Sequence, residues 1–257
     1  MPRIHLTLPL SLAALAVWLG LTLGVRRFVA AGSASVEAAV SSGIGLSWAL
    51  AALFSLALVL ASDGRRAAGL GPPQPLKTFW LASPPLLYAL LMLLLAWAGG
   101  WPMPRVLLIV ACNAALVAVS EELMFRGILL QGMLERYAVW PAVLISSALF
   151  GVVHTTNGLA TGDFSGAWWQ AVAATLQGVG YAAIRLRTRS VWPMVLVHGL
   201  WDFALVTATL PGTAEDGVSI LPYAALLAVL PLCLYGAYLL RPSRRAALAP
   251  DGAAAVK

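Results

Sequence analysis

Charged residues are scarce in this chain of 257 residues: only 10% are Asp, Glu, Lys or Arg, whereas 61% are apolar. A soluble domain has about 25% charged and about 45–50% apolar residues. A core of this size cannot hide such an excess of apolar surface, and the mean hydropathy is +0.87. The composition therefore excludes an ordinary soluble enzyme, a disordered chain and a nucleic-acid-binding domain, and it requires a lipid solvent.

Cysteine and histidine are also rare. Cys112 and Cys233 each lie inside an apolar run, with neither the spacing of a zinc site nor that of a disulfide framework. We interpret both as small apolar residues. Of the three histidines, His5 lies near the N-terminus, whereas His154 and His198 lie inside apolar runs, where a polar side chain is costly.

Apolar segments recur along the chain, and most approach the roughly 20 residues that cross a hydrocarbon core about 30 Å thick. The eight segments cover about 6–25, 41–61, 79–98, 105–134, 138–156, 166–184, 191–210 and 218–240. We predict an all-α fold, a polytopic transmembrane helical bundle with about eight spans. The first segment is too long for the apolar core of a cleavable signal peptide, so we expect it to be retained. The fourth is less apolar after Glu121, and we expect its end to leave the membrane or to run along it.

We expect residues 1–245 to form a single transmembrane helical domain, with the motif-bearing half at about 105–210. Residues 246–257 are rich in alanine and predict a disordered cytoplasmic tail. Gly20 and Gly24 have the spacing of a small-xxx-small helix contact, which predicts packing against another helix.

The basic residues fall mostly in alternate loops. With the N-terminus in the cytoplasm, twelve of the sixteen lie on the cytoplasmic side, three on the other side, and Arg126 within a span. Cytoplasmic loops carry an excess of Lys and Arg. We therefore predict a multi-pass protein of the cytoplasmic (inner) membrane with both termini in the cytoplasm, and the net charge of +6 then needs no nucleic-acid partner. The twelve are Arg3, Arg65, Arg66, Lys77, Arg136, Arg185, Arg187, Arg189, Arg241, Arg244, Arg245 and Lys257.

Three short clusters place ionisable residues inside predicted spans: 120–126, 150–154 and 198–202. Each such residue costs at least about 2.5–3.5 kcal/mol near the centre of the bilayer, so these clusters indicate function rather than helix packing alone. In an α-helix, Glu122 and Arg126 lie about 40° apart around the axis, which predicts an ion pair. Glu121 lies about 140° from Arg126 and is left without that partner.

His198 and Asp202 are also four residues apart and share a helix face, and Phe150 lies one turn before His154. We expect Glu121, His154, His198 and Asp202 to converge from three helices into one polar pocket, with Phe150 as a wall. Counting about 1.5 Å per residue from the span ends, the depths of Glu121 and His154 agree, whereas His198 is shallower.

At these residues the chain resembles the CPBP family of intramembrane proteases, named for CAAX proteases and bacteriocin-processing enzymes and also called Abi proteins. That family has Glu-Glu-x-x-x-Arg, Phe-x-x-x-His and His-x-x-x-Asn/Asp motifs on successive membrane helices. All three occur here in order over about residues 120–202. The resemblance implies that Glu121 is the catalytic glutamate, that His154 binds or polarises the water, and that His198 and Asp202 complete the site. Glu122, Arg126 and Phe150 would support it.

One departure concerns the last motif. The CAAX endopeptidases of the family have Asn at that position, where the amide donates a hydrogen bond to an oxyanion. Asp202 donates one only when it is protonated.

Two mechanisms fit these residues. In the first, Glu121 is the general base for a water held with His154, and His198 stabilises the oxyanion. In the second, a metalloprotease-like site of Glu121, His154, His198 and Asp202 binds Zn²⁺ and leaves an open position for water. The chain has no His-Glu-x-x-His helix, and the resemblance implies a glutamate-dependent reaction, so we favour the metal-free form and predict no firm cofactor.

The sequence thus predicts an intramembrane endopeptidase that hydrolyses a peptide bond in a membrane-associated or lipidated substrate. Its expected partners are a peptide or protein substrate in the membrane and the lipid bilayer. The alternatives are a non-catalytic scaffold that binds partner membrane proteins and an ion-coupled transporter, because chains of Glu, His and Asp also relay protons.

Overall fold

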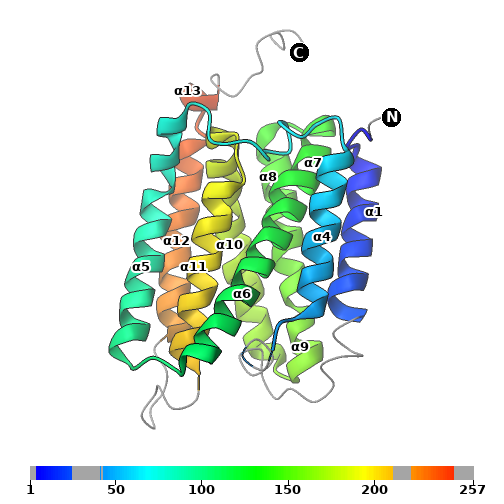
Figure 1. Cartoon of the computed structure of the whole chain (residues 1–257). Helices are drawn as coiled ribbons and strands as arrows, with labels where there is room; N and C mark the ends of the chain where they lie inside the picture. Colours follow the sequence, from blue (N-terminus) through cyan, green and yellow to red (C-terminus); the bar gives the residue numbers. More distant parts are fainter. Residues whose placement is uncertain (1–3, 25–40, 42, 211–220, 246–257) are drawn as a thin grey trace.

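The computed structural model describes residues 4–24, 41, 43–210 and 221–245, and no β-strand occurs among them. A helix occupies each of the eight apolar segments, so the predicted all-α bundle is confirmed (Figure 1). The predicted tail at 246–257 lies outside the described residues. The helices are α1 (Leu8–Leu19) with its π-helical extension η1 (Gly20–Gly24), α4 (Leu46–Ala61), the 3₁₀ helix η2 (Leu76–Ala82), α5 (Ser83–Ala98), α6 (Pro104–Glu121), the π-helix η3 (Glu122–Leu129), α7 (Leu130–Arg136), α8 (Val139–His154), α9 (Thr156–Thr161), α10 (Phe164–Thr188), α11 (Trp192–Thr209), α12 (Leu221–Leu239) and α13 (Pro242–Arg245).

The outer surface of the bundle carries many large apolar side chains, including Leu94 and Leu108, which are 55% and 67% exposed. So much exposed apolar surface is stable only in contact with lipid. By length and composition, three of the described helices are able to cross a membrane: Leu76–Ala98, Pro104–Arg136 and Val139–Leu159. Shorter apolar helices cover Leu8–Gly24, Leu46–Ala61 and Leu227–Leu239. The chain is a helical membrane protein, and the number of eight spans stays a prediction.

The fourth apolar segment is one continuous helical rod, and the position of its end relative to the membrane stays a prediction. α6, η3 and α7 follow each other without a break and together cover 33 residues. α6 is inclined to its neighbours (Figure 1). The rod widens into a π-helix at Glu122, in the middle of the first motif. Wider turns of this kind often occur at functional sites.

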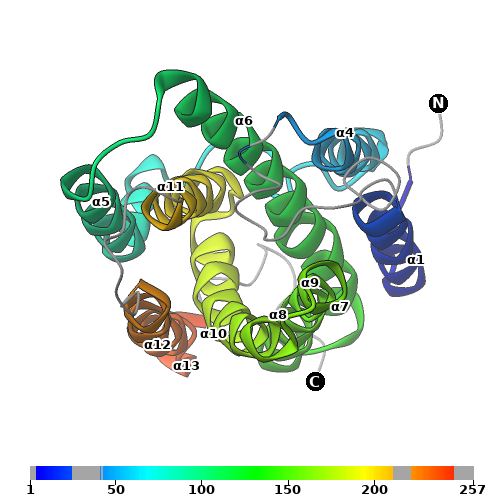
Figure 2. The ribbon, with the colours of Figure 1, turned by 90° about the horizontal axis from the view of Figure 1, so that it is seen from below.

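Close helix packing at the centre of the bundle depends on glycine. α10 packs against α8 and α12, and α11 packs against α5 and α6, while α1 and α4 flank the other side of α6 (Figure 2). A Cβ at Gly151 of α8 would lie 1.9 Å from Thr175 Oγ1 of α10, and one at Gly178 would lie 2.9 Å from Ser147 Cβ of α8. Small residues let membrane helices approach in this way because lipid supplies little drive for association.

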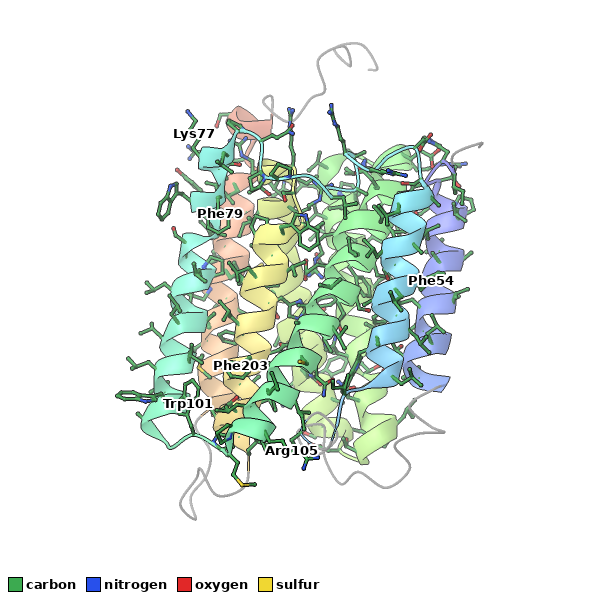
Figure 3. The ribbon with its side chains drawn as sticks, viewed as in Figure 1. Phe54, Lys77, Phe79, Trp101, Arg105 and Phe203 are labelled. Carbon is green, nitrogen blue, oxygen red and sulfur yellow. The ribbon has the colours of Figure 1, made fainter. Side chains whose placement is uncertain are left out.

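At one end of the bundle, several hydrogen bonds connect segments that are far apart in the sequence. They join the N-terminal segment, the ends of α4, α7 and α10, and the start of α11, and α13 lies at the same end (Figure 1). Lys77 lies at this end and Arg105 at the opposite one (Figure 3). The loops that were predicted to share one side of the membrane therefore do share one end of the molecule. The bonds are Ile4 N–Ala61 O (3.2 Å), Leu8 N–Glu135 Oε2 (2.9 Å), Gln74 N–Thr188 O (2.9 Å) and Val191 N–Gly69 O (2.9 Å).

Candidate active site

Glu122 and Arg126 form the ion pair expected from their spacing. Arg126 Nη1 lies 3.2 Å from Glu122 Oε1, and the two side chains are 2% and 0% exposed. The pair lies in a π-helical turn rather than in the α-helix assumed from the sequence, so the angles predicted for an α-helix do not apply there. A side chain four residues away remains within reach. The guanidinium also stacks 4.0 Å from the centre of the Phe150 ring, which a cation favours when it is shielded from water.

His198 connects the motifs of two helices. Its Nδ1 lies 2.8 Å from Glu122 Oε1, and its Nε2 lies 3.7 Å from Glu121 Oε2 and 3.4 Å from Asp202 Oδ2. The imidazole is 4% exposed. Glu121, left without Arg126 in the sequence argument, therefore has His198 beside it. The shallow depth counted for His198 does not separate it from Glu121, because the inclined α6 brings the carboxylate to it.

The cluster of ionisable groups contains more acids than bases. Glu121, Glu122 and Asp202 face the single guanidinium of Arg126, with the imidazole of His198 between them. Uncompensated charge is expensive in a site of low dielectric. The cluster therefore approaches neutrality only when protons are bound within it. A group of this kind is suited to accept and return protons during a reaction.

His154 lies at the C-terminal end of α8, and its ring has a defined hydrogen-bonding pattern. Nδ1 lies 2.7 Å from the backbone oxygen of Phe150. Since a carbonyl oxygen only accepts, Nδ1 is the donor, and Nε2 is left for another partner. The Phe150 ring separates the two imidazoles, with its centroid 4.7 Å from that of His154 and 6.2 Å from that of His198.

Glu121 and His154 line one pocket. It lies between α1, α4, α6 and α8, and its rim includes the first residues of α9. The indole rings of Trp18 and Trp48 form part of the pocket wall, and the Ser120 hydroxyl is part of its lining. His198 lies beside Glu121, and the side chain of Asp202 is 28% exposed. Of the four residues predicted to converge in one pocket, Glu121 and His154 line it, whereas His198 and Asp202 lie beside Glu121 and outside this lining. Phe150, expected as a wall, is not part of the lining either, because its ring is buried between the two imidazoles.

The donor atoms do not fit a metal site of three or more protein ligands. Within the part of the chain that the structure describes, no group of three His, Cys, Asp or Glu side chains is placed to hold a metal ion.

Two residues near the site, Tyr181 and Trp18, lie outside the three sequence motifs. Tyr181 of α10 is 1% exposed, and its ring centre lies 5.7 Å from that of His198 and 5.4 Å from the Arg126 guanidinium carbon. Trp18 of α1 donates its indole N–H to Ser120 Oγ at 2.7 Å. An aromatic residue in an apolar helix is inexpensive, so the sequence contains no signal that would single out either residue.

The fold and this cluster define a class: a helical membrane protein with a buried group of acids and histidines beside a pocket. Residues 103–204 match the model of the Rce1-like family, described as type II CAAX prenyl endopeptidase Rce1-like. The match covers less than half of the chain but contains all three motifs, and it confirms the resemblance seen in the sequence. No curated protein and no solved structure matches this chain.

Proposed function

We propose that this protein is an intramembrane endopeptidase that hydrolyses a peptide bond in a membrane-associated or lipidated peptide or protein. The observation that carries the proposal is the position of Glu121, which lines a pocket with His154 and lies 3.7 Å from His198 Nε2. A carboxylate between imidazoles beside a pocket is suited to general-base chemistry. The similarity of residues 103–204 to a family of CAAX endopeptidases supports the same class of reaction.

In the proposed reaction, Glu121 takes a proton from a water in the pocket while the water oxygen attacks the carbonyl carbon of the scissile bond. His154 orients that water, because its Nδ1–H is donated to Phe150 O and Nε2 is left to accept the second hydrogen. A tetrahedral intermediate with one negative oxygen results. Its collapse breaks the C–N bond, and Glu121 gives its proton to the leaving amine. One water is consumed and Glu121 is restored.

In this proposal, His198 stabilises the negative oxygen of the tetrahedral intermediate. Its Nδ1–H is donated to Glu122 Oε1 at 2.8 Å, so His198 acts as an imidazolium in this step, in which Nε2 also carries an N–H that stabilises the negative oxygen. Asp202 lies 3.4 Å from that Nε2, and its carboxylate favours the imidazolium electrostatically. A protonated Asp202 would take the place of the amide that CAAX endopeptidases have at this position.

The test is Glu121→Gln, which keeps the shape of the side chain and removes the base. The purified protein in liposomes is given a quenched fluorescent peptide that ends in a CAAX sequence, with and without an S-farnesyl group. We expect kcat to fall by about 10²–10⁴, the range typical of general-base catalysis. Glu135→Gln on α7 is the matched control, since Glu135 lies at the end of the bundle and pairs with the N-terminal segment. It should cleave at the wild-type rate.

A Glu121→Gln protein that cleaves like the wild type would exclude this mechanism. Protein that cleaves neither peptide, while Glu121→Gln leaves its cellular phenotype intact, would favour the scaffold alternative. Uptake of a solute or protons into liposomes that depends on Glu121 would favour the transporter.

We also propose that hydrolysis needs no metal; the supporting observation is that, among the residues that the structure describes, no three His, Cys, Asp or Glu side chains are placed to share one ion. Incubation with 1,10-phenanthroline or EDTA should leave the rate of peptide cleavage unchanged. Elemental analysis of the active protein should find less than about 0.1 zinc per chain. Loss of activity that zinc restores would show that the second mechanism is the right one.

A further inference from the structure

α1 lies outside the residues that match the protease family, yet it is bonded along the whole rod that carries Glu121. Trp18 Nε1 donates to Ser120 Oγ of α6 at 2.7 Å, and Ser11 Oγ donates to Ile128 O of η3 at 3.1 Å. At the end of the rod, Glu135 of α7 accepts from Leu8 N at 2.9 Å. Figure 2 shows α1 beside α4 at the flank of this rod. One helix therefore contacts all three parts of the rod.

The bond from Trp18 is the one nearest to the candidate catalytic residue. Ser120 directly precedes Glu121, and Trp18, Ser120, Glu121 and His154 all line the same pocket. Trp18 is 4% exposed and Ser120 1% exposed. An indole N–H buried away from water requires an acceptor, and the Ser120 hydroxyl is the one it has. The bond fixes the helix end from which the Glu121 carboxylate projects.

A second set of contacts leads from the same indole to His154. The Trp18 ring meets Phe125 edge-on with centroids 5.6 Å apart, and Phe125 meets Phe150 at 4.9 Å. Phe150 in turn lies 4.7 Å from the His154 ring. Trp18 thus reaches both sides of the pocket, through a hydrogen bond on the Glu121 side and through packed rings on the His154 side.

We propose that Trp18 is a positioning residue of the hydrolytic site: its indole N–H holds Ser120, and thereby sets the Glu121 carboxylate against the water held by His154. The proposal rests on the proposed function. It differs from a packing role, because packing depends on the ring, whereas positioning depends on the N–H. Small errors in geometry are costly, since a displacement of about 1 Å lowers the rate of a catalysed step by up to about 10².

Trp18→Phe and Ser120→Ala each remove this one bond, the first while keeping an aromatic ring against Phe125. We expect each variant to lower kcat about ten-fold with KM unchanged, measured with the CAAX peptides in liposomes. The double variant should be no slower than either single variant, because both remove the same interaction. Ser120→Thr restores a hydroxyl and should recover most of the rate. Trp97→Phe, at an indole 63% exposed on α5, is the matched control and should be unaffected.

A second readout does not depend on activity. In protein labelled with 5-fluorotryptophan, the ¹⁹F resonance that is missing from Trp18→Phe identifies Trp18. Ser120→Ala should shift that resonance and leave those of the other nine indoles in place. An unshifted resonance, or full activity of both Trp18→Phe and Ser120→Ala, would overturn the positioning role while leaving the proposed function intact. Absence of cleavage by the wild-type protein would instead refute the proposed function, and the positioning role with it.

Discussion

At the scale of single residues, the candidate site divides into a buried part and a part nearer the surface. Arg126, Glu122 and His198 form a continuous chain of contacts, in which every side chain is at most 5% exposed. Glu121 and Asp202 lie on the other side of the imidazole, with side chains 15% and 28% exposed. Since a reacting group must meet substrate and water, Glu121, which lines the pocket, is better placed for chemistry than the buried chain. The buried chain fixes the ring of His198 between them.

The buried chain predicts a strong coupling between Glu122 and Arg126. Arg126→Met leaves the carboxylate of Glu122 buried without its cation, and loss of one partner of a buried pair costs about 3–5 kcal/mol. We expect a marked fall in the melting temperature of the detergent-solubilised protein. Arg126→Met combined with Glu122→Gln should recover more than half of that loss, because no isolated charge remains. If the double variant loses as much stability as the two single variants, Arg126→Met and Glu122→Gln, lose together, the ion pair is not the reason that these residues are buried together.

The sequence identified the polar residues of the site but not all of their partners. The Glu122–Arg126 pair follows from spacing on one helix, and so does the proximity of His198 and Asp202. The contact of His198 with Glu122 joins α11 to η3 and depends on how two helices are rotated against each other, which no local pattern records. The spacing of residues along the chain therefore predicts contacts within one helix but not contacts between two helices.

At the scale of helices, the boundaries were predictable and the local geometry was not. The long apolar runs placed a helix in each of the eight segments because lipid-facing side chains must be apolar all along a span. The π-helix at Glu122–Leu129 was missed, since the hydrogen-bond register of a helix is set by packing. The packing predicted for Gly20 and Gly24 is wrong within the described part of the chain, because no atom lies within 4 Å of a Cβ built at either.

A glycine in a tight helix contact and a glycine that faces open space should respond in opposite ways to substitution by alanine. Gly151→Ala places a methyl group 1.9 Å from Thr175 Oγ1 and 2.5 Å from the backbone oxygen of Ala171, so α8 must move away from α10. We expect a loss of stability of at least about 1–3 kcal/mol, typical of overpacking, together with lower activity, because α8 carries His154. Gly20→Ala at the start of η1 meets open space and should leave the melting temperature unchanged or raise it. A Gly151→Ala protein as stable as the wild type would show that α8 and α10 pack less closely than described.

At the scale of the whole molecule, the same end of the bundle carries the hydrogen-bonded connections and most of the basic residues of the described part. The pocket at Glu121 lies toward the opposite end, because it is lined by the end of α8, the start of α9 and the start of α4 (Figure 1). This pocket lies between α1, α4, α6 and α8, and it is where the proposed substrate would meet Glu121. The predicted orientation would direct the basic end toward the cytoplasm.

This orientation is tested by labelling single cysteines placed at opposite ends. Met103, 72% exposed, precedes α6 at the end that carries Arg105, whereas Ala138 lies between α7 and α8 at the basic end. Each is changed to Cys in a Cys112→Ala/Cys233→Ala background, so that no basic residue is removed. A membrane-impermeant maleimide added to intact spheroplasts should label Met103→Cys alone, and permeabilisation should then expose Ala138→Cys. The reverse pattern would place the basic end outside the cell, and equal labelling of both in intact spheroplasts would contradict a bundle that spans the membrane between these two positions.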